Sequence, residues 1–286
     1  MNENLVCAIT GASGYVGSRI AQRLAQDGRV VALCRKPASD ADISWSLSSS
    51  EDVAPLLRQR RVSVLIHAAW DFSAVTAEDI QRVNVEGSIR MLRMAKAAGV
   101  GRIVFISTIS AFIGARSLYG KAKLQVESVA AELGGIILRP GLVFGDSPGG
   151  VFGSIRKQVQ HQKFIPLIGS GKAPQFLVPE ETLAEVVAAA AAGRFDRAPG
   201  EPITVANPHP WPFRDLVRNL ALAQGREVTL IALPWPLLYA GLRTGEILGR
   251  KMPFRSDSVI SFVYQDPAPD FSRLEALGIT VPPWSG

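Results

Sequence analysis

The chain contains few residues that could give it disulfide bonds or a metal site. Its 286 residues include only two cysteines and three histidines, and their spacing fits neither a disulfide framework nor a set of metal ligands. Cys7 and Cys34 each lie inside an apolar run, so we expect buried, reduced thiols. A chain of this length can bury a full hydrophobic core without cross-links, and the sequence predicts no bound metal.

Long apolar runs and a one-sided charge are also missing. The first ten residues, MNENLVCAIT, have neither a basic region nor a long apolar one, so no signal peptide is expected. The most apolar stretch, residues 228–242, contains Pro234 and Pro236 and is too short to cross a bilayer, which favours a core strand followed by a helix. The net charge of +6 is not gathered in one block, which argues against nucleic-acid binding. We therefore expect a cytoplasmic protein with neither a membrane nor a nucleic acid as its partner.

Prolines are scarce in the first half of the chain. Of the 19 prolines, only Pro37 and Pro55 precede Pro140, and this half alternates short apolar runs with segments of helical periodicity. Fully apolar strands separated by amphipathic helices indicate a doubly wound parallel sheet with helices on both faces. In such sheets, ligands bind beyond the carboxyl ends of the strands. The expected strands are residues 5–10, 29–34, 62–69, 102–107 and 135–139, and the expected helices are 14–27, 52–60, 77–98 and 117–133.

The first expected strand runs into a glycine-rich turn, TGASGYVG. Gly11 permits the tight turn, Gly14 lets the backbone approach a pyrophosphate closely, and Gly17 lets the following helix pack against the strand. The N-terminus of that helix offers free N–H groups and a positive dipole to the phosphates. The turn therefore predicts a dinucleotide site. The residues expected to contact the cofactor here are Gly11, Ser13, Gly14, Tyr15 and Val16.

The glycine turn and the proline distribution together predict two parts of an α/β chain. We expect a Rossmann-type doubly wound sheet, the NAD(P)-binding domain, in residues 1–145. A smaller, loop-rich α/β region that binds the substrate is expected in residues 146–286. A helix near residues 180–193 is expected to pack back on the first domain.

The residues at the end of the second expected strand indicate whether the cofactor is NAD(H) or NADP(H). Sites for NAD commonly carry an acidic residue there to hold the ribose 2′-hydroxyl, whereas this chain has Arg35 and Lys36 and no acidic residue. Two cations suit a 2′-phosphate, so the sequence favours NADP(H) over NAD(H) as the cofactor. Asp42 and Ile43 are candidates for the adenine pocket, and Asp42 fits a loop position equally well.

A tyrosine and a lysine near the start of an expected helix suggest acid–base chemistry. Tyr119 and Lys123 are four residues apart, and so lie on one face of that helix. A nearby cation stabilises a phenolate, so we expect Lys123 to lower the pKa of Tyr119 and to make it an acid or base near neutral pH. Lys123 can also reach the ribose hydroxyls of a cofactor. Thr108 follows a buried strand, and its hydroxyl can hold the substrate oxygen that Tyr119 protonates.

Six segments in order carry a resemblance to a known family: TGASGYVG (10–17), IHAA (66–69), VNVEGSIRMLRMA (83–95), VFISTISAF (104–112), YGKAK (119–123) and LRPGLVFG (138–145). In them the chain resembles the extended short-chain dehydrogenases/reductases, of the NAD(P)-dependent epimerase/dehydratase kind that acts on nucleotide sugars. The resemblance covers roughly the first half of the chain. It implies a homodimer through the helix at 77–98 and the helix of Tyr119, and a structural role for His67. The remaining residues it assigns are Thr108, Tyr119 and Lys123 for catalysis, and Ala68, Ala69, Pro140 and Val143 beside the cofactor.

Three functions remain open from the sequence. The resemblance implies an enzyme that transfers hydride at a hydroxyl or keto carbon of a nucleoside-diphosphate sugar, with Arg156, Lys157 and Lys163 as candidates to meet the diphosphate. One alternative is an NADPH-dependent ketoreductase of a lipid-like or aromatic ketone, whose pocket would use the apolar second half around Trp235 and Leu238. The other is a non-catalytic NADP(H)-binding sensor or assembly module.

Overall fold

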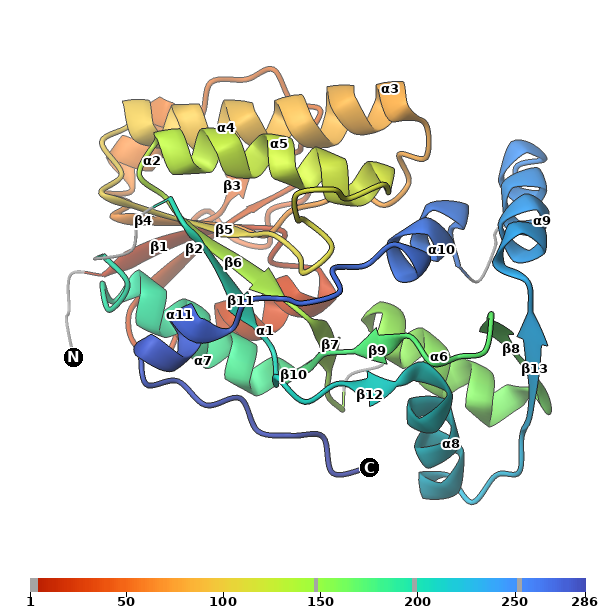
Figure 1. Ribbon diagram of the computed structural model, residues 1–286. Coiled ribbons are helices and arrows are strands. Elements are labelled where there is room, and N and C mark those ends of the chain that lie inside the picture. The colour runs from red at the N-terminus through yellow and green to blue at the C-terminus, as the bar shows by residue number, and fades with distance from the viewer. Residues whose placement is uncertain (1–4, 147–148, 197–199, 251–253) are drawn as a thin grey trace.

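The centre of the molecule is a seven-stranded parallel sheet. The computed structural model describes residues 5–146, 149–196, 200–250 and 254–286. The strand order is β11-β6-β5-β4-β1-β2-β3, and each neighbouring pair is parallel (Figure 1). The order reverses between β1 and β4, so the expected doubly wound α/β fold is confirmed. The strands are β1 (Val6–Thr10), β2 (Arg29–Cys34), β3 (Ile43–Ser44), β4 (Val64–His67), β5 (Arg102–Ile106), β6 (Ile136–Pro140) and β11 (Pro202–Val205).

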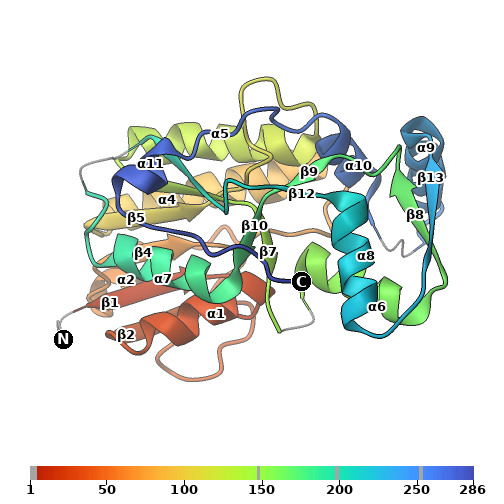
Figure 2. The same cartoon turned by 60° about the horizontal axis from the view of Figure 1, so that its bottom comes forward.

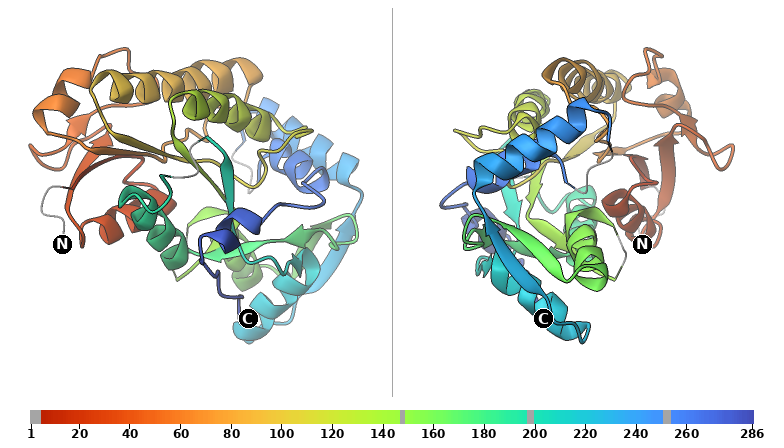
Figure 3. Two further views of the ribbon diagram at one scale, coloured as in Figure 1. Left: turned by 60° about the vertical axis from the view of Figure 1, so that its left-hand side comes forward. Right: turned by 90° about the vertical axis from the view of Figure 1, so that its right-hand side faces the viewer.

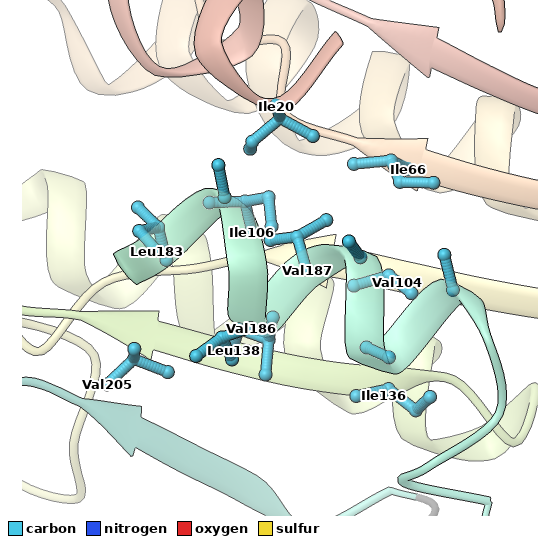
Figure 4. Packing of buried hydrophobic residues seen from close by; sticks show 14 of the residues in the cluster. Ile20, Ile66, Val104, Ile106, Ile136, Leu138, Leu183, Val186, Val187 and Val205 are labelled. Carbon is cyan, nitrogen blue, oxygen red and sulfur yellow. The ribbon is translucent and has the colours of Figure 1, made fainter. Parts of the chain in front are cut away.

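One face of the sheet is covered by helices from both halves of the chain. Apolar residues of α1 (Tyr15–Leu24), α7 (Glu180–Ala191) and α11 (Ser272–Ala276) join one core cluster with the strands. Figure 4 shows Leu183 and Val187 of α7 beside Ile20 of α1 and Val104 of β5. The segment near residues 180–193 therefore packs on the sheet as a helix, and β11 adds a strand to the sheet's edge. Residues beyond 145 thus help to build the central body.

The other face is covered by α2 (Ala54–Gln59), the long element at 77–97 and α5 (Leu118–Glu132) (Figure 1). The sequence predicts one continuous α-helix at 77–98. The structure instead divides this element into α3 (Ala77–Asp79), a π-helical stretch η1 (Ile80–Val85) and α4 (Glu86–Ala97). The wider turn holds Asn84 fully buried, where its side-chain amide bonds both the N–H and the carbonyl of Asp71.

The apolar residues of α4 pack within the chain itself. Met91 and Leu92 are buried in the core cluster of this face, and Ile89 and Met94 are partly buried against it. These contacts within the chain account for the apolar character of α4. The homodimer stays a prediction.

A smaller lobe lies beyond one end of the sheet (Figure 2). Its core combines Phe152, Ile155 and Val159 of α6 with Leu216 and Val217 of α8. Its elements are α6 (Gly150–His161), β8 (Phe164–Ile168), α8 (Phe213–Ala223), β13 (Thr229–Leu233), α9 (Trp235–Ile247) and α10 (Ser256–Val263). Two short strand pairs connect it to the central body: β7 (Leu142–Phe144) with β10 (Leu177–Pro179), and β9 (Pro174–Gln175) with β12 (Trp211–Pro212).

The apolar stretch at 228–242 forms a strand and a helix, as expected, yet neither belongs to the core. No residue of β13 is fully buried, and within α9 only Leu242 and Gly245 are. The expectation of a core strand is therefore wrong, because β13 pairs only with the lobe strand β8 and lies at the outside of the lobe. None of the helices in the described residues has both the length and the apolar character needed to cross a bilayer.

Candidate active site

A cavity of about 1020 Å³ lies where the main sheet meets the smaller lobe. One wall is formed by the segments that follow the carboxyl ends of β1, β2, β3, β4 and β5. The other wall comes from the lobe, with residues of α6, α9 and α10. The cavity is therefore at the sheet edge where the doubly wound fold predicts a ligand.

The glycine turn has the geometry of a phosphate cradle. Gly11 has a φ of +75°, and a Cβ on it would lie 2.9 Å from the Ala69 backbone. A Cβ on Gly17 would lie 2.0 Å from the carbonyl oxygen of Gly11, so glycine alone lets α1 pack this closely. No side chain caps α1 at Gly14, so its first N–H groups are available to an anion. Gly11, Ser13, Gly14, Tyr15 and Val16 all line the cavity.

Only part of the predicted 2′-phosphate site reaches the cavity. Arg35, exposed at the end of β2, lines it, whereas Lys36 does not. Cys34 also lines the cavity and is only partly buried. The expectation of a buried thiol therefore fails at Cys34, because this residue ends its strand at the cavity rim.

Asp42 and Ile43, the residues suggested for the adenine pocket, do not line the cavity. Ile43 is 2% exposed in the core, and the carboxylate of Asp42 accepts hydrogen bonds from the backbone of Ala32, Ala38 and Ser39. Asp42 is thus the loop residue that the sequence left as its alternative. The residues that take their place on the cavity wall are Trp45, Ser46, Leu47 and Ser48. These four residues follow β3, so predicting that short strand from the sequence would have indicated them as cavity-lining residues.

A buried threonine–histidine pair fixes the segment after β4. Thr10 Oγ1 lies 2.8 Å from Nδ1 of His67 and accepts hydrogen bonds from the backbone N–H groups of Ala68 and Ala69. Burial lowers the pKa of His67 to about 3, so the ring is neutral and its Nδ1 shares a hydrogen bond with the Thr10 hydroxyl. His67 thus holds Ala68 and Ala69 on the cavity wall, which fits the structural role that the resemblance implies.

Thr108 and Tyr119 meet at the centre of the cavity wall. Thr108 comes just after β5, and Tyr119 lies in the first turn of α5, which the Ser117 side chain caps by accepting the Gly120 N–H at 3.1 Å. The Tyr119 hydroxyl is hydrogen-bonded to Thr108. The edge of the Trp70 ring packs against Tyr119, with ring centroids 5.4 Å apart. The structure therefore places a phenol and a second hydroxyl together, facing the space next to the glycine turn.

The pKa of Tyr119 differs from the sequence-based expectation. Burial raises it to about 12, although the hydrogen bond with Thr108 acts in the opposite direction. Burial also lowers the pKa of Lys123 to about 7, so this amine is only partly charged near neutral pH. Its Nζ donates to the carbonyl of Ile106 at 2.8 Å and lies 4.3 Å from the centroid of the Trp70 ring. A partly neutral amine held in this way does not lower the pKa of Tyr119 in this state of the protein.

The start of α5 is held by a carboxylate from the smaller lobe. Asp257 of α10 accepts hydrogen bonds from the backbone N–H groups of Leu118 and Tyr119, at 2.8 and 2.9 Å. Glu246 of α9 in turn accepts from the N–H and the hydroxyl of Ser256. A continuous chain of polar contacts thus runs from α9 through α10 to the residue that carries the phenol. No sequence pattern indicates Asp257, because 138 positions separate it from Tyr119.

We expect Asp257→Ala to lower turnover about tenfold, because the phenol loses its fixed position on the cavity wall. The dissociation constant of the cofactor should not change, since Asp257 is remote from the glycine turn. Steady-state kinetics and a cofactor titration measure the two effects. The matched control is Asp270→Ala, whose carboxylate accepts from Ser272 in its own turn. Equal turnover in the two variants would show that the contact does not position Tyr119.

Some of the remaining predicted residues line the cavity, and the others lie outside it. Pro140 and Val143 line the cavity. Arg156, Lys157 and Lys163 do not: Arg156 donates to the carbonyls of Gly145 and Asp146, and the other two are exposed on the lobe. None of these three cations thus lines the cavity; Arg156 and Lys157 lie on α6, and Lys163 follows it.

The lobe gives its half of the cavity an apolar surface. Among the described residues that line the whole cavity, the basic side chains are Arg35, Lys123 and Arg255, and Arg255 already donates to the carbonyl of Ala74. The large apolar residues that the lobe and its connecting strands contribute include Phe176, Phe213, Leu238, Leu242, Phe254, Val259 and Phe262, and polar residues of the same region, among them Gln158, Gln162, Gln175 and Gln265, also line the cavity.

Comparison with known proteins identifies relatives over most of the chain. The model of the NAD dependent epimerase/dehydratase family matches residues 7–201. A Caulobacter vibrioides protein named ceramide reductase is 27% identical over 249 residues, which cover 82% of this chain and 76% of the relative. The UDP-glucose 4-epimerase of Azospirillum brasilense is 25% identical over 185 residues, or 54% of this chain and 53% of the relative.

Solved structures of low sequence identity share the fold. MoeE5 in complex with UDP-glucuronic acid and NAD superposes with a TM-score of 0.74 at 18% identity, covering 97% of this chain and 94% of the other. The UDP-glucose 4-epimerase of Thermotoga maritima, solved with UDP-glucose, gives a TM-score of 0.72 at 18% identity, with the same coverage. At such identities the likeness establishes the arrangement of strands and helices, including the smaller lobe.

Proposed function

We propose that this chain, which belongs to the NAD dependent epimerase/dehydratase family, transfers hydride between a nicotinamide cofactor and a carbon that bears a hydroxyl or keto oxygen. The observation that carries the proposal is one continuous cavity that joins the glycine turn to Thr108, Tyr119 and Lys123. The turn fits a pyrophosphate, since uncapped helix N–H groups face the cavity where no side chain intervenes. A bound nicotinamide cofactor would supply or accept the hydride.

The chain's own groups provide the proton and the orientation. In the direction of reduction, the substrate's keto oxygen would lie between the hydroxyls of Thr108 and Tyr119, which are already hydrogen-bonded to each other. A phenol with a raised pKa holds its proton at neutral pH, so Tyr119 donates it to the oxygen as negative charge develops there. Lys123, buried against Trp70, supplies a donor for the cofactor's ribose hydroxyls and a charge that stabilises the phenolate left behind.

The cofactor that we propose is NADP(H) in preference to NAD(H), on the evidence of Arg35. This arginine lines the cavity at the end of β2, and we expect Arg35→Ala to weaken NADPH binding by about tenfold to a hundredfold through the lost contact with the 2′-phosphate. NADH binding should hardly change. Fluorescence titration with both nucleotides measures this, and Lys36→Ala is the matched control because Lys36 lies outside the cavity. Equal affinities of the wild-type protein for the two cofactors would overturn the preference.

For the substrate, the apolar half of the cavity favours a ketone on an aliphatic chain. Phe254, Val259 and Phe262 bring large apolar surfaces to the space beyond Tyr119, and such a wall is stabilised by burying alkyl groups rather than a diphosphate. The Caulobacter vibrioides relative, named for reducing a ceramide, matches 82% of this chain. We therefore place the NADPH-dependent ketoreductase ahead of the sugar-nucleotide enzyme that the motifs alone suggest.

A nucleoside-diphosphate sugar is the second candidate. It is favoured by two relatives named UDP-glucose 4-epimerase, which match 54% and 39% of the chain. Arg255 is the basic residue that the lobe contributes to the described lining of the cavity. It could bind a diphosphate only by giving up its hydrogen bond to the carbonyl of Ala74.

Paired assays distinguish the two substrates. We expect NADPH oxidation with a long-chain aliphatic ketone to exceed, by at least about tenfold in kcat/KM, the activity with a short-chain ketone that lacks the alkyl tail, because the tail fills the apolar half of the cavity. Interconversion of UDP-glucose and UDP-galactose should be absent. Activity confined to the sugar nucleotides would overturn the ketoreductase and establish the second candidate.

A further inference from the structure

Helix α9 lies at the edge of the molecule, with one side facing the cavity. Figure 1 places it beyond α10, and the right-hand view of Figure 3 shows it outermost on the side that faces the viewer. Its inward side carries Leu238 and Leu242, which line the cavity, and Glu246, which bonds Ser256. These contacts fix which side of the helix turns outward.

The outward side of α9 is an apolar stripe. Leu237, Ile247 and Leu248 are 68, 72 and 63% exposed. At 3.6 residues per turn they fall on a stripe about 120° wide, opposite Leu242 and Gly245. The other members of this stripe, all exposed, are Ala240, Gly241 and Thr244.

The lobe segments that include this stripe carry an excess of positive charge. Residues 150–179 and 208–250, which build most of the lobe, contain nine Lys and Arg but three Asp and Glu, so their excess equals the +6 of the whole chain. Between residues 228 and 250 the single acidic residue is Glu246, which points inward to Ser256. Arg243, next to Ile247 on the helix surface, has its Nη1 3.5 Å from Oε2 of Glu246, Arg250 is exposed just beyond the helix, and the stripe itself contains no carboxylate.

We propose that the outward stripe of α9 docks on the surface of an anionic lipid bilayer. A helix with an apolar face and basic flanks lies in the membrane interface, where apolar burial and attraction to anionic headgroups add together. Docking by this face sets the apolar half of the cavity directly beneath the bilayer surface, since Leu238 and Leu242 line the cavity from the same helix. The proposal differs from the expectation, drawn from the sequence, that the protein has no membrane partner. Docking goes beyond the proposed reaction and does not depend on it.

The test is co-sedimentation of the full chain with phosphatidylcholine vesicles, with and without phosphatidylglycerol. We expect binding to the anionic vesicles, weakened at least about tenfold in the triple variant Leu237→Ser, Ile247→Ser, Leu248→Ser because most of the buried apolar area is lost. Arg243→Gln should weaken it about fivefold and leave binding to neutral vesicles unchanged. The matched control is Leu222→Ser, which removes a leucine that is 73% exposed on α8, outside the stripe.

Three outcomes would overturn the proposal. The first is that the wild-type protein stays in the supernatant at millimolar anionic lipid. The second is that the triple variant binds vesicles as tightly as the Leu222→Ser control. In the third, the wild-type protein does not bind vesicles and sediments as a dimer that the triple variant converts to a monomer, which would assign the stripe to a second copy of the chain. Cofactor binding and the thermal unfolding midpoint, measured on each variant, verify that the fold is intact.

Discussion

The variant Tyr119→Phe should lose turnover by roughly 10³-fold and still bind the cofactor with wild-type affinity. The ring is retained, so its packing against Trp70 and Phe72 is preserved. What disappears is the hydroxyl that Thr108 bonds and that we propose to protonate the substrate oxygen. Single-turnover kinetics with preloaded NADPH measure the chemical step directly, free of product release.

The same experiment decides whether the chain is a catalyst or a non-catalytic cofactor-binding module. The matched control is Tyr264→Phe, because Tyr264 lies outside the cavity, where its ring packs beneath Arg116. Turnover within about twofold of the wild type in Tyr119→Phe would remove the phenol from the mechanism. It would leave the sensor or assembly role as the remaining function.

Replacing Lys123 should have the second largest effect. Lys123→Met keeps the length of the side chain but removes the amine that bonds Ile106 and lies beside Trp70. We expect kcat to fall about a hundredfold, because the phenolate loses its stabilising charge, and the KM of the cofactor to rise with the loss of the ribose contact. Lys121→Met, an exposed lysine on the same helix, is the matched control. An unchanged kcat would contradict the assigned role.

Lys123 also gives the protein's stability a specific dependence on pH. In the fold its pKa is about 7, against an ordinary value of 10.5, so between these values the unfolded chain binds more protons than the folded one. The free energy of unfolding therefore rises with pH in this window, and the cost of burying the charged amine is largest below pH 7. Relative to Lys123→Met, the wild-type protein should gain up to about 1.4 kcal/mol per pH unit between pH 7.5 and 9.

Urea unfolding at several pH values measures this difference on the cofactor-free protein. The comparison with the variant cancels the other titrating groups, such as Cys7, whose pKa burial raises to about 11. A wild-type curve parallel to that of Lys123→Met would mean that the amine is not desolvated in the fold.

The parts of the fold that the sequence predicts are those fixed by local chemistry. Gly11 is required by its φ of +75°, Gly17 is required by its close approach to Gly11, and the apolar runs of β1, β4 and β5 leave no polar face. The family suggested by the motifs is confirmed by the match over residues 7–201. The sequence also predicts that Thr108 and Tyr119 lie close together, because Thr108 follows an expected strand and Tyr119 lies near the start of the next expected helix.

Features that depend on distant contacts could not be predicted. Asp257 reaches the start of α5 from α10, and only the three-dimensional arrangement of the lobe brings it there. The pKa of Tyr119 is set by burial beneath Trp70 and Phe72, which outweighs the influence of the lysine that the spacing suggested. β13 and α9 are apolar enough for a core, yet among the described residues no further layer covers their outer sides.

The central claim is that a nicotinamide ring binds next to the Tyr119 hydroxyl with its phosphates on the glycine turn. The most direct measurement is a crystal structure of the protein with NADPH bound. We predict the reactive C4 atom of the nicotinamide within about 4 Å of the Tyr119 oxygen and the pyrophosphate against Gly14 and Tyr15. A ring bound at the far end of the cavity, or crystals that remain free of dinucleotide at saturating NADPH, would contradict the account.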